Sequence, residues 1–259
     1  MEITDFAGLT SPLLDDAGFR HAFFTRQGGV SVPPWDSLSF AVSVGDNPEA
    51  VRENFARAAH WLGVDAGRLY VLSQVHGTAA RLLTGAEDRD EVVRSVGDVT
   101  MSRITGVACG VRSADCVPVL VADRSSGAAA AIHSGWRGTV ANATAAGVAA
   151  LREAIGGRGE LLAAIGPHIE TCCFEVGEDV AAQLAGCSAL GAAAVIGGGA
   201  GGKARVDLRR IVRAQLEAVG VTEIDDVRGC SVCERERFHS YRRDGKRSGR
   251  MLSAIVARE

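Results

Sequence analysis

Three side chains able to bind a metal or act in nucleophilic catalysis stand beside short apolar runs. His76 follows YVLSQV, Cys116 precedes VPVLVA, and His133 follows AAAAI. Two neutral imidazoles and one thiolate suit Zn²⁺ in an open tetrahedral site whose fourth position is left for water. The same side chains also suit a metal-free hydrolase with Cys116 as nucleophile and His133 as its base. Both chemistries stay open at this point.

The three side chains are far apart in the chain, so the fold has to assemble any shared site. Small, turn-forming residues lie beside each of them, namely Gly77, Ala114–Asp115 and Ser134–Gly135. Such residues leave room for a ligand to approach the backbone. A buried Cys is often only a small hydrophobe, however, and a lone His is often structural. The pattern indicates a site and the spacing does not prove it.

A mixture of strands and helices would have to position these groups. Short apolar runs separated by Gly, Asp and Ser predict the strands of a mixed sheet, among them RLYVLSQV, GVACGV, VPVLVA, AAAAI and LLAAI. Apolar residues at helical spacing predict helices over Glu49–Leu62, Thr139–Ile155 and Val206–Val219. The two kinds of element intermingle without a Pro-rich linker. We therefore expect an α+β fold that forms one domain over residues 1–259.

Composition excludes several classes of partner. The chain has 259 residues, a net charge of -3 and 47% hydrophobic residues, with no free-standing cluster of Lys and Arg before the C-terminus. Nucleic acid is therefore not expected as a main partner. The start of the chain lacks a basic and apolar leader pattern, and no apolar run is long enough to span a membrane. We expect a cytoplasmic protein without a membrane anchor.

Cysteine usage agrees with a reducing compartment. Seven cysteines is an odd number, and the adjacent Cys172 and Cys173 have a spacing that rarely suits a bridge. Cys230 and Cys233 form a C-x-x-C, which in isolation indicates redox chemistry or half a zinc knuckle. No second C-x-x-C pair accompanies it. We predict a structural role for this pair, and packing near the pocket for His168 and the adjacent cysteines.

Six motifs together resemble one known family. In chain order they are FFTRQGGVS, SQVHG, SADCVPVL, HSGWRG, IGPHIETCCFEVG and HSYRRDGKRSGR, and the resemblance covers about Phe23 to Arg258. In this the chain resembles the YfiH-type purine nucleoside phosphorylases, also called the laccase-domain or multicopper polyphenol oxidase family and peptidoglycan editing factor. The resemblance implies mixed β-sheets sandwiched between helical layers, in the order α/β/β/α. It also implies phosphorolysis of adenosine, inosine and methylthioadenosine, with adenosine deamination as a second activity.

The resemblance assigns roles to residues by position. The family's zinc ligands match His76, Cys116 and His133, which would be both metal-binding and catalytic. The zinc deaminase signature H-x-E with P-C-x-x-C is absent, so deamination would need another source of proton transfers. Phosphorolysis needs cations beside C1′ of the pentose. The expected substrate-binding residues are Arg26, Gln74, Asp115, Arg137, Tyr241, Arg242 and Arg243.

Several of these residues could instead have purely structural roles. Arg137 could pair with a surface carboxylate, and Arg242 and Arg243 could form an exposed hairpin rim. Asp115 could cap a turn. The motifs also depart from the family pattern at Ser37–Phe40, at Ser43–Asp46, within Phe238–Arg243 and at Phe174. These departures concern substrate preference more than zinc binding.

Other functions compete with this interpretation. A blue multicopper site needs many imidazoles and a dedicated His-Cys-His segment, whereas the chain has only six His. This count argues against a copper-dependent polyphenol oxidase. A Cys-His hydrolase or an amidase that edits cell-wall precursors could use the same side chains, and a nucleotide-binding module without turnover stays open.

Overall fold

Two large sheets packed face to face form the centre of the molecule. The computed structural model describes residues 8–197 and 200–259. The single domain predicted over 1–259 includes residues 1–7 and 198–199, which lie outside this described part. The first sheet has the order β1 (Gly8–Leu9), β2 (His21–Phe24), β14 (Met251–Val256), β6 (Ala108–Ser113) and β3 (Leu69–Tyr70).

The second sheet is mixed and contains the strands that lead to the site. Its central pair, β7 and β8, is antiparallel, with Val117 opposite Ser134 and Pro118 opposite His133. The parallel pairs lie at its two edges. The strand order is β13 (Glu223–Asp226), β9 (Leu161–Ile165), β7 (Val117–Asp123), β8 (Ala129–Ser134), β5 (Val99–Ser102) and β4 (Ala80–Leu83).

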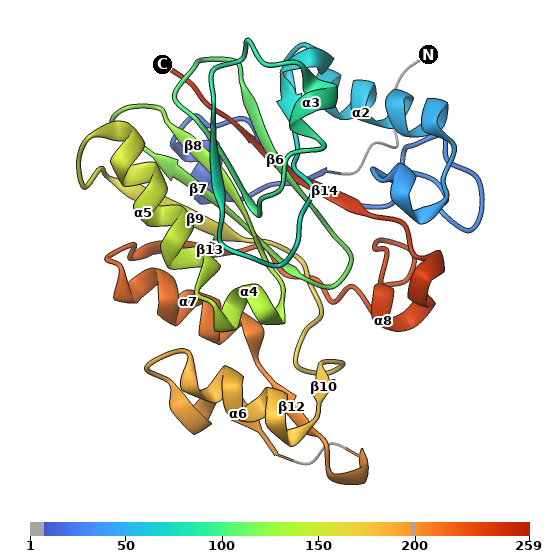
Figure 1. Ribbon diagram of the computed structural model, residues 1–259, viewed down its shortest axis with the longest axis vertical. Helices are drawn as coiled ribbons and strands as arrows, with labels where there is room; N and C mark the ends of the chain where they lie inside the picture. Colours follow the sequence, from blue (N-terminus) through green and yellow to red (C-terminus); the bar gives the residue numbers. More distant parts are fainter. Residues whose placement is uncertain (1–7, 198–199) are drawn as a thin grey trace.

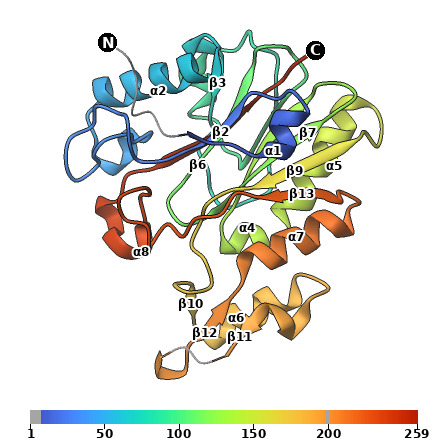
Figure 2. The same ribbon diagram turned by 180° about the vertical axis from the view of Figure 1, so that it is seen from behind.

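A small third sheet forms a lobe at one end of the molecule. It consists of β10 (Glu175–Val176), β12 (Ala204–Val206) and β11 (Val195–Ile196). Figures 1 and 2 show this sheet together with helix α6 (Glu178–Gly186), below the two large sheets. The lobe lies in the long connection between the parallel neighbours β9 and β13.

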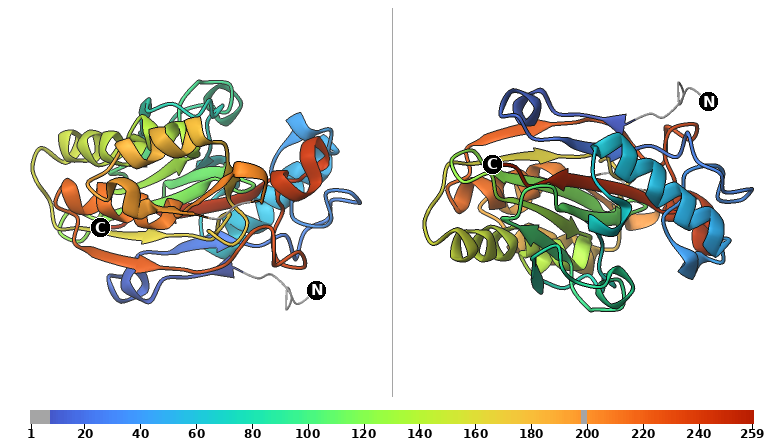
Figure 3. Two further views of the ribbon diagram at one scale, coloured as in Figure 1. Left: turned by 90° about the horizontal axis from the view of Figure 1, so that it is seen from below. Right: turned by 90° about the horizontal axis from the view of Figure 1, so that it is seen from above.

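Helices cover the outer faces of both large sheets. Helix α2 (Pro48–Leu62) packs on the first sheet, and α5 (Ala143–Ile155) and α7 (Leu208–Ala218) pack on the second. The end-on views show α2 and α5 on opposite sides of the sheets (Figure 3). The shorter helices are α1 (Pro12–Asp16), α3 (Arg89–Val92), α4 (Trp136–Val140) and α8 (Tyr241–Asp244). Among the described residues, each helix is too short or too polar to cross a membrane.

Alternation along the strands explains this layering. In β7, Val119 and Val121 face the helices on the second sheet, while Leu120 and Ala122 face the first sheet. Side chains of a strand point alternately to opposite faces, so an entirely apolar strand serves two cores at once. The predicted α+β class with an α/β/β/α order of layers is confirmed.

The predicted helices are found with one correction. The helices expected over Glu49–Leu62 and Val206–Val219 are confirmed as α2 and α7. The single helix expected over Thr139–Ile155 is wrong, because Asn142 has a left-handed φ of 58° and separates α4 from α5. Its side chain caps α5 by accepting a hydrogen bond from the backbone N–H of Ala145. Asn tolerates the left-handed region better than most residues, which an apolar pattern does not reveal.

Candidate functional site

The structure brings His76, Cys116 and His133 together. Their ligand atoms all lie within 4.8 Å of one another. The Cys116 sulfur is 3.7 Å from Nε2 of His76, and the two imidazole rings meet edge to face at 5.0 Å. All three line a cavity of about 620 Å³.

His76 lies in a loop that continues from the first sheet. The strand predicted over RLYVLSQV is short, since β3 ends at Tyr70, and His76 itself has a φ of 63°. Gln74 and His76 therefore lie in this loop and not on a strand. The carboxylate of Asp98 holds the loop by accepting hydrogen bonds from the backbone N–H groups of Val75, His76 and Gly77.

Cys116 lies where the chain crosses from one large sheet to the other. Strand β6 of the first sheet ends at Ser113, and β7 of the second sheet begins at Val117. Asp115 has a φ of 98° in this crossing. Its carboxylate accepts hydrogen bonds from the Ser231 hydroxyl at 2.6 Å and from the backbone N–H of Arg242 at 2.6 Å. The segment that carries the Cys116 thiol is therefore fixed by Ser231 and Arg242 through Asp115.

His133 is buried near the end of β8. Its Nδ1 donates to Asp98 at 2.8 Å, so Nε2 is the ring nitrogen that faces Cys116 and the cavity. The following turn is narrow, because a Cβ on Gly135 would lie 2.5 Å from the ring of His76 and 2.7 Å from the Cys116 sulfur. A glycine here makes room for the three side chains to meet.

The local charges favour a thiolate at Cys116. Burial alone would raise the pKa of this thiol, but the charge of His133 and hydrogen bonds from His133 and His76 lower it to about 6. Burial likewise opposes the charge on His133, yet Cys116 and Asp98 raise the pKa of its imidazole to about 9. Burial also opposes ionisation of Asp98, and its bonds to His133 and Gly77 hold the pKa of that carboxyl below its usual range.

This donor set fits a single metal ion. Two imidazole nitrogens and a readily ionised sulfur converge on one point, and a buried carboxylate fixes the orientation of one imidazole. That combination is typical of zinc sites in which three protein ligands leave one position open.

Arginine and aromatic side chains form the remaining walls of the cavity. Arg112 lies beside Arg250, and burial together with the charges of Arg250 and Arg89 lowers the pKa of Arg112 to about 10. Two neighbouring guanidinium groups indicate a place for an anion. The cavity is also lined by Trp136, Phe174, Tyr241 and Arg242.

Five of the predicted substrate-binding residues line this cavity. Gln74 is fixed by a pair of hydrogen bonds with the backbone of Arg112. Arg137 is exposed and lies over the Trp136 ring at 4.3 Å. Arg242 donates to the carbonyl groups of Cys173 and Glu175. The five are Gln74, Asp115, Arg137, Tyr241 and Arg242.

The other two predicted contacts lie elsewhere. Arg26 pairs with Asp36 at 3.2 Å and lines a separate polar cavity of about 580 Å³. Arg243 donates to the carbonyl groups of Ser231, Val232 and Phe238, and so holds the backbone around α8. In this conformation neither guanidinium reaches the His–Cys–His cavity.

Three residues of the site have no counterpart in the sequence-based prediction. They are Asp98, Arg112 and Arg250. Asp98 directly precedes the strand VTMS, which is too short and too polar to draw attention as an apolar run. Arg250 ends the motif HSYRRDGKRSGR and Arg112 directly precedes SADCVPVL, but only the antiparallel register of β6 and β14 brings the two arginines close together.

The fold and the site together define a class of protein, namely α/β/β/α proteins with a His–Cys–His centre where the chain crosses between two sheets. Residues 20–258 match the family model described as multi-copper polyphenol oxidoreductase laccase. The chain therefore belongs to this family, which also contains the relatives named YfiH.

Curated relatives cover almost the whole chain. It is 38% identical over 251 residues to a purine nucleoside phosphorylase of Pseudomonas aeruginosa, covering 96% of this chain and 98% of the relative. It is 37% identical over 231 residues to the purine nucleoside phosphorylase YfiH of Escherichia coli, covering 89% and 90%.

Solved structures show the same fold. YlmD from Geobacillus stearothermophilus superposes with a TM-score of 0.88 at 30% identity, covering 100% of this chain and 98% of the other. Protein NMB0706 of Neisseria meningitidis superposes with a TM-score of 0.83 at 34% identity, covering 98% and 99%.

Proposed function

We propose that this protein is a zinc-dependent purine nucleoside phosphorylase that acts on adenosine, inosine and methylthioadenosine, with adenosine deamination as a second activity. The observation that carries the proposal is one cavity in which a His–Cys–His ligand set faces arginine and aromatic side chains. Relatives named purine nucleoside phosphorylase, at 37–38% identity over most of the chain, support the substrate class.

The arginine wall suits the phosphate. In phosphorolysis a phosphate oxygen forms a bond to C1′ of the pentose as the glycosidic C–N bond breaks, and the base leaves with the bonding electrons and takes up a proton. Arg112, Arg250 and Arg242 line the cavity and can hold the phosphate while positive charge develops on the sugar. Arg137 lies at the rim and can steer the anion inward.

The aromatic wall suits the base. Trp136 is half-buried and Phe174 is buried, and both line the cavity that contains the three ligands. Flat apolar rings of this kind pack favourably on a planar purine. Tyr241 is half exposed and adds a hydroxyl at the entrance.

His76, Cys116 and His133 would hold the metal. When bound, zinc supplies a Lewis acid that polarises an oxygen and lowers the pKa of a water molecule. Asp98 keeps the proton of His133 on Nδ1, so that Nε2 is available as a donor. The thiolate of Cys116 forms readily because its pKa is lowered to about 6.

A turnover assay with a matched pair of variants tests this proposal. Purified protein given adenosine and phosphate should produce adenine and ribose 1-phosphate, followed by chromatography, and inosine from adenosine would report deamination. His76→Ala should lose the metal and most activity, because it removes one of three ligands of an open site. His60→Ala should change neither, because His60 is exposed on α2.

Elemental analysis accompanies the assay. Zinc is expected in the wild type, and stoichiometric copper with little zinc would overturn the choice of metal. If adenosine, inosine and methylthioadenosine all remain intact in the presence of phosphate, phosphorolysis is ruled out.

One observation favours a second candidate, a cysteine hydrolase or amidase that edits cell-wall precursors. Cys116, with its lowered pKa, would be the activated nucleophile, and His133, with its raised pKa, would be the base that takes its proton. The carboxylate of Asp98 would orient His133. Such an enzyme would keep its activity after zinc is stripped and lose it on thiol alkylation. A phosphorylase dependent on zinc would lose activity on stripping and regain it when zinc is added.

We also propose that the protein works in the cytoplasm. Its cysteines are free thiols in the described structure, which a reducing compartment preserves.

A further inference from the structure

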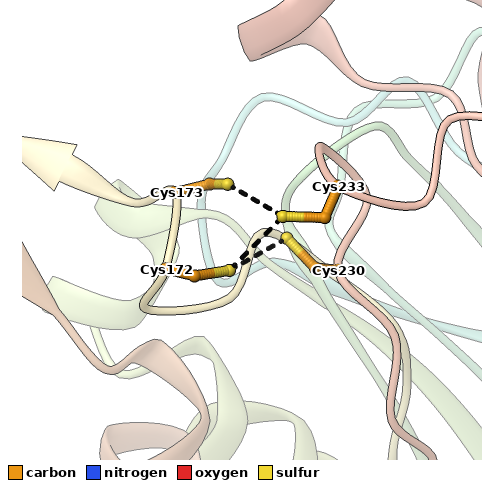
Figure 4. A group of neighbouring side chains, drawn as sticks. All are labelled: Cys172, Cys173, Cys230 and Cys233. Carbon is orange, nitrogen blue, oxygen red and sulfur yellow. Dashed lines mark hydrogen bonds between the residues drawn. The ribbon is translucent and has the colours of Figure 1, made fainter.

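Four cysteine sulfurs meet outside the cavity. Cys172 and Cys173 lie in a turn after β9, and Cys230 and Cys233 lie in a turn after β13 (Figure 4). The four Sγ atoms all lie within 4.8 Å of one another. Cys172 and Cys173 therefore form a second pair beside the C-x-x-C of Cys230 and Cys233. The sequence does not reveal this, because the two members of the second pair are adjacent to each other and far from the C-x-x-C in the chain.

The spacing of the sulfurs matches one tetrahedral ion. The Cys172 sulfur lies 3.5 Å from that of Cys230 and 3.6 Å from that of Cys233, and the Cys173 sulfur lies 3.3 Å from that of Cys233. Zinc–sulfur bonds of about 2.3 Å at tetrahedral angles place sulfurs about 3.8 Å apart. An iron–sulfur cluster distributes its cysteines over several irons and so needs wider separations.

Backbone groups surround one of the four sulfurs. Cys230 is buried, and backbone groups of Glu170, Val232 and Cys233 hydrogen-bond its sulfur. Backbone N–H donors of this kind stabilise a thiolate and orient it as a ligand. Cys172 and Cys233 are exposed, which gives an ion a path to the site.

We infer that Cys172, Cys173, Cys230 and Cys233 bind one structural Zn²⁺, separate from the His–Cys–His centre. Four thiolates close the coordination sphere, so this ion has no open position for a substrate or water. The site rests on its own geometry and not on the proposed activity.

The cluster joins two segments that form one wall of the cavity. Phe174 directly follows Cys173, and Arg242 donates to the Cys173 carbonyl at 3.2 Å. Ser231 directly follows Cys230 and donates to Asp115, the neighbour of Cys116. An ion that clamps the two turns therefore fixes an arginine and an aromatic side chain of the cavity as well as the ligand-bearing crossing.

Metal counting tests the inference without an activity assay. His76→Ala, purified with a reductant and supplied zinc, should retain about one zinc per chain. X-ray absorption at the zinc edge should then show sulfur neighbours only, at about 2.3 Å. Adding Cys172→Ser and Cys233→Ser to His76→Ala should remove that zinc, whereas adding Cys187→Ser should not. Cys187 is a free, half-buried thiol outside both groups.

Two further results keep the inference testable if the double serine variant fails to fold. Cobalt added to metal-depleted His76→Ala should give the strong visible absorption of a tetrahedral thiolate complex, and removal of zinc by a chelator should lower the melting temperature of His76→Ala. The inference would be overturned if His76→Ala contained no zinc, or contained iron in its place. It would also be overturned if the four cysteines of the wild-type protein formed disulfides under reducing conditions. None of these results depends on phosphorolysis.

Discussion

At the scale of single residues, Asp98 connects the imidazole of His133 to the backbone of the His76 loop. One oxygen of its fully buried carboxylate accepts from Nδ1 of His133 and from the backbone N–H of His76, and the other accepts from the N–H groups of Val75 and Gly77. Its own backbone carbonyl also accepts from the N–H of His133. It touches neither the cavity walls made by arginine nor those made by aromatic residues, so it acts by positioning.

Replacing this carboxylate should weaken metal binding more than it weakens the fold. In Asp98→Asn the amide keeps its volume but loses charge and acceptor capacity, so we expect zinc affinity at the His–Cys–His centre to fall about 10–100-fold. Competition with a chelating dye would measure this. Asp90→Asn, at an exposed position of α3, is the control. Equal affinity in both variants would show that His133 needs no such partner.

At the scale of elements, the turn between β8 and α4 determines whether the ligands can meet. Gly135 has a φ of -70°, which any residue can adopt, so its role is to provide space and not conformational freedom. The atoms that a Cβ would meet belong to His76 and Cys116 themselves. The turn and the two ligands thus fit only if no side chain stands at this position.

Gly135→Ala should therefore lose metal and activity while the protein stays folded. The added methyl would push His76 and Cys116 apart, and we expect a loss of at least 10-fold in zinc affinity, measured by the same competition. Gly157→Ala is a matched control, because a Cβ there meets nothing within 4 Å. A Gly135→Ala protein with full zinc content and turnover would contradict this account.

At the scale of the whole molecule, two buried histidines outside the site make stability depend on pH. His168 lies beside Arg209 below the second sheet, and His239 lies beside Gly249 near α8. Burial, reinforced by the charge of Arg209 for the first and Arg26 for the second, lowers the pKa of each imidazole to about 3. Both are neutral in the folded protein near neutral pH.

Acid should consequently destabilise the fold over a defined range. Between about pH 6.5 and pH 3 the unfolded chain binds protons at these histidines and the folded chain does not, so stability falls as pH falls. Each contributes about 1.4 kcal/mol per pH unit within that range. Urea unfolding at several pH values should show a smaller slope for His239→Asn than for the wild type, and an unchanged slope for His60→Ala. Equal slopes in all three would contradict the burial of a neutral His239.

How far the sequence could predict the molecule depended on the range of the interactions. Helix α2 and the strands β7 to β9 follow from local periodicity, and the motifs around His76, Cys116 and His133 follow from the family resemblance. The break at Asn142, the proximity of Arg112 and Arg250 and the meeting of Cys172 with Cys230 did not follow. A single backbone angle decides the first, and the register and order of strands decide the other two.

The crossing at Asp115–Cys116 has a mechanical consequence. His76 lies in a loop that continues from the first sheet, and His133 belongs to the second sheet. Cys116 lies in the short connection between β6 and β7. If the two large sheets moved past each other, the three side chains would separate. An ion bound by all three would therefore oppose relative movement of the sheets. We therefore expect substrate to enter the cavity without a shift of the two sheets relative to each other.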